Sequence, residues 1–194
     1  MTYEEWKENF VNEKGQQPWD YYSKSAKNLK IDTKQFDRYK DVLGKNAPKT
    51  LEEFQELKYT NYERYRFVKL DYMRQNTLLE NPELKLPNAN DVTIDDRKFS
   101  DYLYNPSNGG VFAKGKAFTS RLGYDVLNYK DLQEEIRYSA SRYPAIFKDN
   151  NGYGNRYEQK IILYGNRGKP SNVVVGWLCN DNDTKMTSVY IKEV

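Results

Sequence analysis

One segment near the C-terminus of this 194-residue chain limits its fold more than any other. The run VVVGWLC at residues 173–179 carries apolar side chains at odd and even positions alike. A strand of this kind is apolar on both faces, so it needs cover on both and lies centrally in a sheet. We expect its neighbours to be strands at about 156–164 and 185–193, because the short turn sequences GNRGKP and NDND separate the three runs.

Two helices are predicted before these strands. The stretch VFAKGKAFTSRLGY has Gly123 as its C-cap. The stretch NYKDLQEEIRYSASRYP has Asn128 as its N-cap and Pro144 beyond its last turn. Two helices that lead into an antiparallel sheet of three to four strands make an α+β unit.

The N-terminal half is predicted to be helical. Capping-box patterns begin at Thr2 and at Thr50, each with a glutamate three residues later. A long helical run follows Thr50, and a short helix between residues 30 and 49 is expected to end at Gly44. Because this half is helical and the other half contains the strands, we predict an α+β protein with a helical N-terminal part.

A domain division is predicted between residues 96 and 97. Pro82 and Pro87 interrupt helix formation, and the segment around them is interpreted as an extended linker. The charge also changes sign there: residues 1–96 carry 16 Lys and Arg and 18 Asp and Glu (net −2), and residues 97–194 carry 15 and 10 (net +5). The C-terminal part is therefore the expected partner of a polyanion.

The composition limits the available chemistry. The chain has no histidine, and Cys179 is its one cysteine, which argues against a zinc site and excludes histidine-based nucleophile systems. We expect no metal and no cofactor. The lone cysteine and the lack of an apolar run long enough for a membrane suit a protein of the cytoplasm that has no membrane partner.

Charged residues alternate along the first predicted strand. Arg156, Glu158 and Lys160 share one face of it. In the last strand, Ser188, Tyr190 and Lys192 share one face, and Thr187 is expected on the other with Val189 and Ile191. These polar residues are either the solvent side of a half-buried sheet or an acid–base surface for a substrate.

Several segments carry a family resemblance. LGKNAPKTLEEFQELKY, FSDYLYNPSNGGVFAKGKAF and NGYGNRYEQKIILYGNRGKPSNVVVGWL resemble the C-terminal region of minor head (minor capsid) proteins of phages that infect Firmicutes. Their terminal domain is in turn similar to toxin modules with the fold of barnase, colicin and contact-dependent inhibition ribonucleases. The resemblance implies an RNase-like domain at 97–194. Without the head-assembly region, it also implies a free-standing anti-host or anti-defence factor, such as an anti-CRISPR protein in the host cytoplasm.

On this reading the protein is a metal-independent ribonuclease that acts on CRISPR guide RNA or tRNA. Glu158 is the expected base, Arg156 and Lys160 hold the phosphate, and Lys116 or Tyr190 protonates the leaving oxygen. Further RNA contacts are expected from Lys114, Arg121, Lys160, Thr187, Ser188 and Lys192.

The second hypothesis is a binder without catalytic activity that blocks a host nucleoprotein, or a component of a phage head. Its protein-binding arm would be the aromatic helical segment with Tyr62, Tyr65, Phe67 and Tyr72. Packing of these aromatic residues within the protein is the alternative. The sequence leaves both hypotheses open, as it does the oligomeric state.

Overall fold

A computed structural model describes residues 25–194 of the chain. The helix predicted to start at Thr2 lies outside the described residues. The described chain divides into two compact units, with the boundary between Tyr72 and Met73. The division predicted between residues 96 and 97 stays a prediction.

The first unit is helical, as expected. It contains α3 (Ala26–Leu43), the short 3-10 helix η1 (Gly44–Asn46), α4 (Leu51–Thr60) and the first part of α5 (Tyr62–Glu80). The N-cap predicted at Thr50 is confirmed, because the Thr50 side chain accepts a hydrogen bond from the Glu53 amide at 3.1 Å, whereas the Glu53 carboxylate accepts from the Lys49 amide and not from that of Thr50. Helix α3 ends before Gly44 as predicted, but it begins at Ala26 and is 18 residues long.

The core of the first unit combines one buried carboxylate with packed aromatic rings. Asp32 is fully buried and accepts hydrogen bonds from Lys58, Gln55 and Tyr59 of α4, with Lys58 Nζ 2.7 Å from Oδ1. These partners satisfy a charge that would otherwise be costly to bury. The stacked rings of Tyr39 and Tyr72 lie 4.4 Å apart between centroids.

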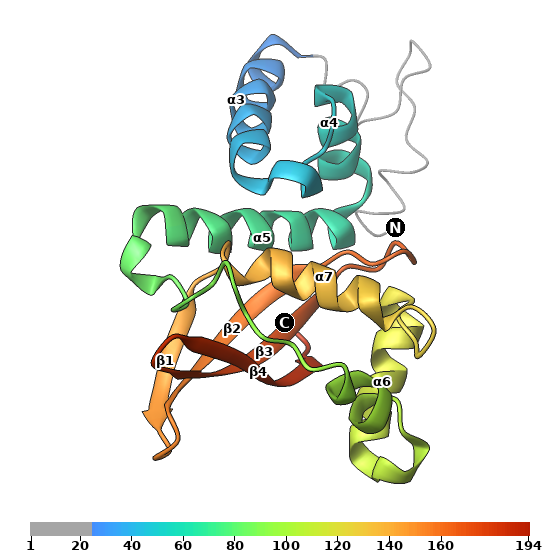
Figure 1. Cartoon of the computed structure of the whole chain (residues 1–194). Coiled ribbons are helices and arrows are strands. Elements are labelled where there is room, and N and C mark those ends of the chain that lie inside the picture. The colour runs from blue at the N-terminus through green and yellow to red at the C-terminus, as the bar shows by residue number, and fades with distance from the viewer. Residues whose placement is uncertain (1–24) are drawn as a thin grey trace. The chain divides into compact units, whose positions relative to one another are not determined.

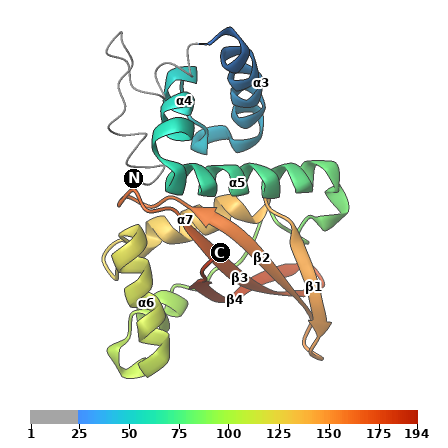
Figure 2. The ribbon, with the colours of Figure 1, turned by 180° about the vertical axis from the view of Figure 1, so that it is seen from behind.

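The second unit is an α+β structure, which confirms the predicted fold class. Its helical elements are the last part of α5, η2 (Pro82–Leu84), the π-helix η3 (Lys98–Leu103), η4 (Pro106–Asn108), α6 (Gly109–Leu122) and α7 (Tyr129–Ala140). Its strands are β1 (Ala145–Asn150), β2 (Asn155–Leu163), β3 (Ser171–Asn180) and β4 (Asp183–Ile191). Figure 1 shows α7 crossing one face of the sheet, and Figure 2 shows the strands from the opposite side.

The sheet is antiparallel with the order β1-β2-β3-β4. Strand β3 therefore lies between two neighbours, as its sequence predicts, and its apolar side chains are buried on both faces, except Leu178, which is partly buried. The core lies between the sheet and α6 and α7, with Phe118 and Leu122 from α6 and Leu132 and Ile136 from α7 fully buried.

The segment after η2 belongs to this core, although it has no regular secondary structure. Leu86, Ala89, Val92 and Ile94 are all buried there. Thr93 exchanges backbone hydrogen bonds with β4, donating to the Thr184 carbonyl at 2.8 Å and accepting from the Met186 amide at 2.9 Å. This pairing covers part of the outer edge of β4.

Helix α6 depends on one glycine at its centre. A Cβ atom at Gly115 would lie 2.2 Å from the Leu103 carbonyl oxygen and 3.1 Å from the Tyr104 ring. Only a residue without a side chain allows η3 and α6 to approach so closely. Gly123 ends α6 in the left-handed region at φ 78°, which confirms the predicted C-cap.

We predict that Gly115→Ala lowers the free energy of unfolding by about 1–3 kcal/mol, because backbone must move to admit the methyl group. Gly110→Ala, in the same helix, is the matched control, since nothing lies within 4 Å of a Cβ there. It should change the free energy of unfolding by no more than about 0.5 kcal/mol. Denaturant unfolding of both variants measures the difference, and equal effects would contradict the close packing of α6.

Candidate functional site

The charged residues predicted on β2 do share one face, and cross-strand pairing extends them into rows. Glu158 of β2 pairs with Gly176 of β3, which pairs with Ser188 of β4. In the neighbouring row, Lys160 is joined through Val174 to Tyr190. The row on the other side runs Arg156, Leu178, Lys185. This face lies opposite the core, because Gln159 and Trp177 between the rows are buried on the other side.

The face is covered at one end and open at the other. At the covered end, Ile162 and Asn172 are buried, and the Asn172 side chain accepts a hydrogen bond from Arg74 of α5 at 2.7 Å. From Lys160 onward the face opens: Lys160 and Arg156 are exposed, and Glu158 is partly buried. We call this part of the sheet, around Glu158, Gly176 and Ser188, the open face.

Gly176 lies in the open face beneath two hydroxyl groups of β4. A Cβ atom at this position would lie 2.5 Å from Ser188 Oγ and 3.1 Å from Thr187 Oγ1. Both hydroxyl groups therefore converge over the glycine and occupy the space that a side chain would take. A glycine inside a strand often marks such a close approach.

The position of Thr187 corrects the expectation from simple alternation. Gly176 pairs with Ser188 while Trp177 pairs with Met186, so Thr187 is the extra residue of a β-bulge. The bulge brings its hydroxyl to the same side as that of Ser188. Val189 lies in the core.

Arg156 forms an ion pair with Asp149, a residue that was not predicted as part of the site. Its Nε donates to Asp149 Oδ1 at 2.5 Å, and Nη2 pairs with Oδ2, so the two side chains form a two-pronged ion pair between β1 and β2. The hydrogen bonds from Arg156 lower the pKa of the Asp149 carboxyl below its ordinary value. Both side chains are about half exposed, so solvent weakens the pair.

Two predicted RNA contacts come from α6 and have partners within the protein. Lys114 Nζ lies 5.2 Å from the centre of the Tyr190 ring, so the helix and the open face meet at this cation–π contact. Arg121 forms an ion pair with Glu193 just beyond β4. Lys192, in contrast, is exposed, and within residues 25–194 its side chain forms no ion pair.

Lys116 does not join this group. It lies two residues from Lys114, about 200° around the helix by α-helical geometry, and so on the opposite side. Its Nζ lies over the Phe112 ring, 4.9 Å from the centroid, and it lines a separate pocket with Tyr104 and Arg167. The fold thus brings Glu158, Ser188, Thr187 and Tyr190 to one face and places Lys116 elsewhere.

Trp177 is 1% exposed and lies in the core, so it offers no surface for stacking of a base. Of the aromatic residues proposed for a protein-binding arm, Tyr65 packs against Phe54, and Phe67 is buried. Tyr62 is 60% exposed.

Within residues 25–194 there is no cluster of three or more His, Cys, Asp or Glu side chains that could hold a metal ion. No helix among these residues combines the length and the apolar character that a membrane span requires.

The fold and the site define an α+β protein with a four-stranded antiparallel sheet, one face of which is partly open and carries basic, acidic and hydroxyl groups. The chain belongs to the family DUF6883, described as a domain of unknown function, which matches residues 85–193. Comparison with curated proteins found no match. Among solved structures, the chain is similar to one in the contact-dependent growth inhibition toxin–immunity protein complex from Klebsiella pneumoniae 342. The identity is 19% and the TM-score 0.43, over 51% of this chain and 98% of that chain.

We predict that Arg156→Ala returns the pKa of Asp149 toward its ordinary value of 3.8. In the parent protein, the ion pair therefore stabilises the folded state at pH values above the ordinary pKa of Asp149. This stabilisation is lost as the pH falls through the lowered pKa. NMR titration of the carboxyl carbon measures the pKa in both proteins, and Asp95, paired with Arg97, is an internal control that should not change. An Asp149 pKa that is the same in both proteins would contradict the ion pair.

Proposed function

We propose that the open face binds single-stranded RNA and that Glu158 acts as the general base in its cleavage through the 2′-hydroxyl group. The observation that carries this proposal is the row Glu158–Gly176–Ser188. Adjacent strands lie about 4.8 Å apart, so the backbones of the two outer residues are about 10 Å apart, with the glycine between them. That gap can hold a phosphate group with a carboxylate on one side and hydroxyl groups on the other.

Each chemical role has a side chain nearby. Glu158 removes the proton from the 2′-hydroxyl group, which attacks the adjacent phosphorus and forms a cyclic phosphate. Ser188 and Thr187 donate hydrogen bonds to the phosphate oxygens, and Lys160, two residues along β2 on the same face, balances the added charge of the transition state. Tyr190, with Lys114 over its ring, is the candidate that returns a proton to the leaving 5′ oxygen. These steps need no histidine.

Charge supports a polyanion as the ligand of the open face. Lys160 and Lys185 are exposed there, and neither forms an ion pair within residues 25–194. Arg156 is neutralised in part by Asp149, and we therefore assign it to positioning of β1 against β2 and to a weaker phosphate contact. Lysines of this kind position a nucleic acid through its phosphates without reading its sequence.

We propose RNA rather than another polyanion because the sequence resembles the terminal domain of phage minor head proteins and RNase-fold toxins. Guide RNA and tRNA are the substrates to test first, in line with an anti-defence or anti-host role in the bacterial cytoplasm.

A second candidate is a binder that blocks a host nucleoprotein without catalysis. The observation that favours it is the group of exposed apolar side chains around the β1–β2 hairpin, where Ile146 is 53%, Phe147 54% and Tyr153 80% exposed. Exposed aromatic residues of this kind are frequent in protein interfaces.

We predict that Glu158→Gln abolishes cleavage of RNA in EDTA while the affinity for RNA stays equal or rises slightly, because the amide keeps the size of the carboxylate but cannot accept the proton. Glu83→Gln, an exposed glutamate of η2, is the matched control and should cleave like the parent. Gel analysis of tRNA and guide RNA measures cleavage. Cleavage by Glu158→Gln at the parent rate would rule out this base, and no cleavage by the parent would favour the binder.

Lys160→Ala should weaken RNA binding and reduce its dependence on salt. One phosphate contact on a single strand contributes about 0.7 to the slope of log K against log salt concentration. Lys69→Ala on α5 removes the same charge from the first unit and should leave the slope unchanged. Fluorescence anisotropy with a labelled, 2′-O-methyl RNA, which cannot be cleaved, measures both slopes. Identical slopes for parent and Lys160→Ala would exclude Lys160 from the interface.

A further inference from the structure

A pocket on the side of α6 opposite Lys114 combines aromatic and basic side chains. It has a volume of about 400 Å³ and is formed by four segments of the second unit: the residue that follows η3, α6, the loop after α6, and the β2–β3 loop. The lining residues are Tyr104, Phe112, Lys116, Thr119, Ser120, Asp125, Val126 and Arg167. A volume of this size is in the range that holds a small ligand.

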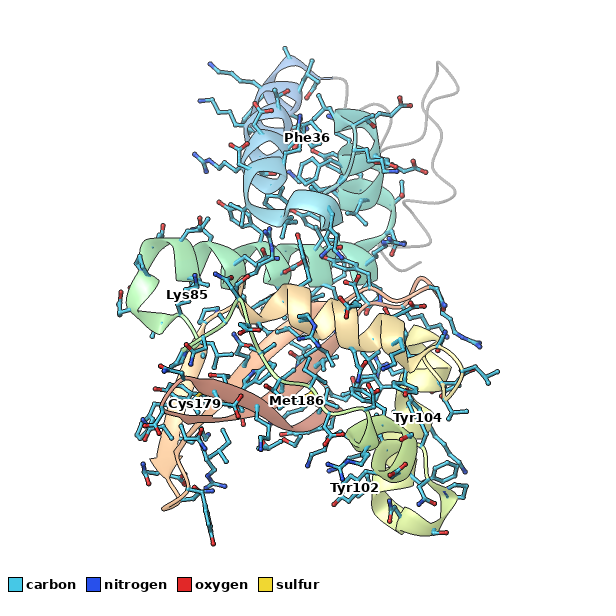
Figure 3. All side chains as sticks on the ribbon, viewed as in Figure 1. Phe36, Lys85, Tyr102, Tyr104, Cys179 and Met186 are labelled. Atoms are coloured by element: carbon cyan, nitrogen blue, oxygen red, sulfur yellow. The ribbon has the colours of Figure 1, made fainter. Side chains whose placement is uncertain are left out.

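The apolar part of the pocket is held rigidly. The hydroxyl groups of Tyr104 and Thr119 both donate to the Tyr124 carbonyl oxygen, at 2.8 and 2.9 Å. Burial raises the pKa of Tyr104 well above its ordinary value, so this donor keeps its proton. Gly115 allows the Tyr104 ring to lie against α6, where Figure 3 shows it. Because Phe112 also lines the pocket, the pocket offers aromatic surface to a planar group.

The polar part of the pocket is set up for an anion. Lys116 and Arg167 are exposed, and within residues 25–194 neither forms an ion pair. Two cations from different segments that converge on one pocket suit a phosphate group, which accepts charge-assisted hydrogen bonds from both. Asp125 accepts the Leu127 amide through Oδ1 at 2.8 Å, and its other carboxylate oxygen can accept from an exocyclic amino group.

We propose that this pocket binds a nucleotide, with the base beside Tyr104 and Phe112 and the phosphate on Lys116 and Arg167. The ligand is either a free nucleotide or one nucleotide of an RNA strand, since both present the same base and phosphate. The pocket and the open face lie on opposite sides of α6, so the proposal does not require that the open face cleaves RNA.

Titration calorimetry of the full chain with adenosine monophosphate tests the proposal, with adenosine and inorganic phosphate as partial ligands. The nucleotide should bind in a saturable way and more tightly than either part. Lys116→Ala and Arg167→Ala should each weaken binding by about five- to tenfold, because each removes a charge-assisted contact to phosphate. Lys69→Ala on α5 is the matched control: it removes the same charge from the first unit, so it should leave the affinity unchanged.

A 2′-O-methyl RNA hexamer forms the second arm, because it separates the two sources of the nucleotide. Binding of the hexamer that depends on Lys116 and Arg167, without binding of the mononucleotide, assigns the pocket to a strand. Binding of the mononucleotide by a protein that does not cleave RNA would support the pocket and reject the ribonuclease. No saturable binding of either ligand, or binding that both alanine variants leave unchanged, would overturn the proposal.

Discussion

The side chain of Gln159 connects the elements on which the C-terminal unit depends. It is 1% exposed, and its Nε2 donates to the carbonyl oxygens of Ala140 and Tyr143, at 2.9 and 2.8 Å, while its Oε1 accepts from Trp177 Nε1 at 2.9 Å. These bonds join β2 to the end of α7, to the entry of β1 and to β3. Because the group is fully satisfied, its burial carries no unpaired polar atom, and losing one partner would leave one.

Gln159 also fixes which residues of β2 face solvent. Side chains alternate along a strand, so a glutamine held in the core places Glu158 and Lys160 on the opposite side. A shift of register by one residue would bury both charges, at a high cost in free energy. On the same side of the sheet, Ile162 and Asn172 are buried, and this covered end limits the extent of the open face. The candidate site therefore lies on the exposed part of a sheet face whose other end is buried.

The parts of this structure that follow a regular period could be predicted from the sequence. Alternation in β2 identified the face of Glu158, and the two-sided apolar run identified β3 as central. The bulge at Thr187 could not be predicted, since it depends on the pairing of β4 with β3. The close approach of other atoms to Gly176 could have been predicted, because a glycine inside an apolar strand often marks such a position.

Two other features show what sequence periodicity can and cannot predict. The separation of Lys114 from Lys116 follows from 100° of rotation per residue, once the helix is known to pack with Phe118 inward. The contribution of Leu86 and Val92 to the core does not follow from any period, because they lie in an irregular segment after Pro82. Their burial depends on Thr93 pairing with β4, a contact between residues about 90 positions apart.

The most direct test of the account is an NMR titration of the full chain with a 2′-O-methyl RNA hexamer, read out at the backbone amides. The account predicts the largest chemical-shift changes at Gly176, at Thr187 and Ser188, and at Glu158 and Lys160, with little change in α3 and α4. Changes confined to the helical first unit or to the exposed β1–β2 hairpin, with the amides around Gly176 unmoved, would contradict it.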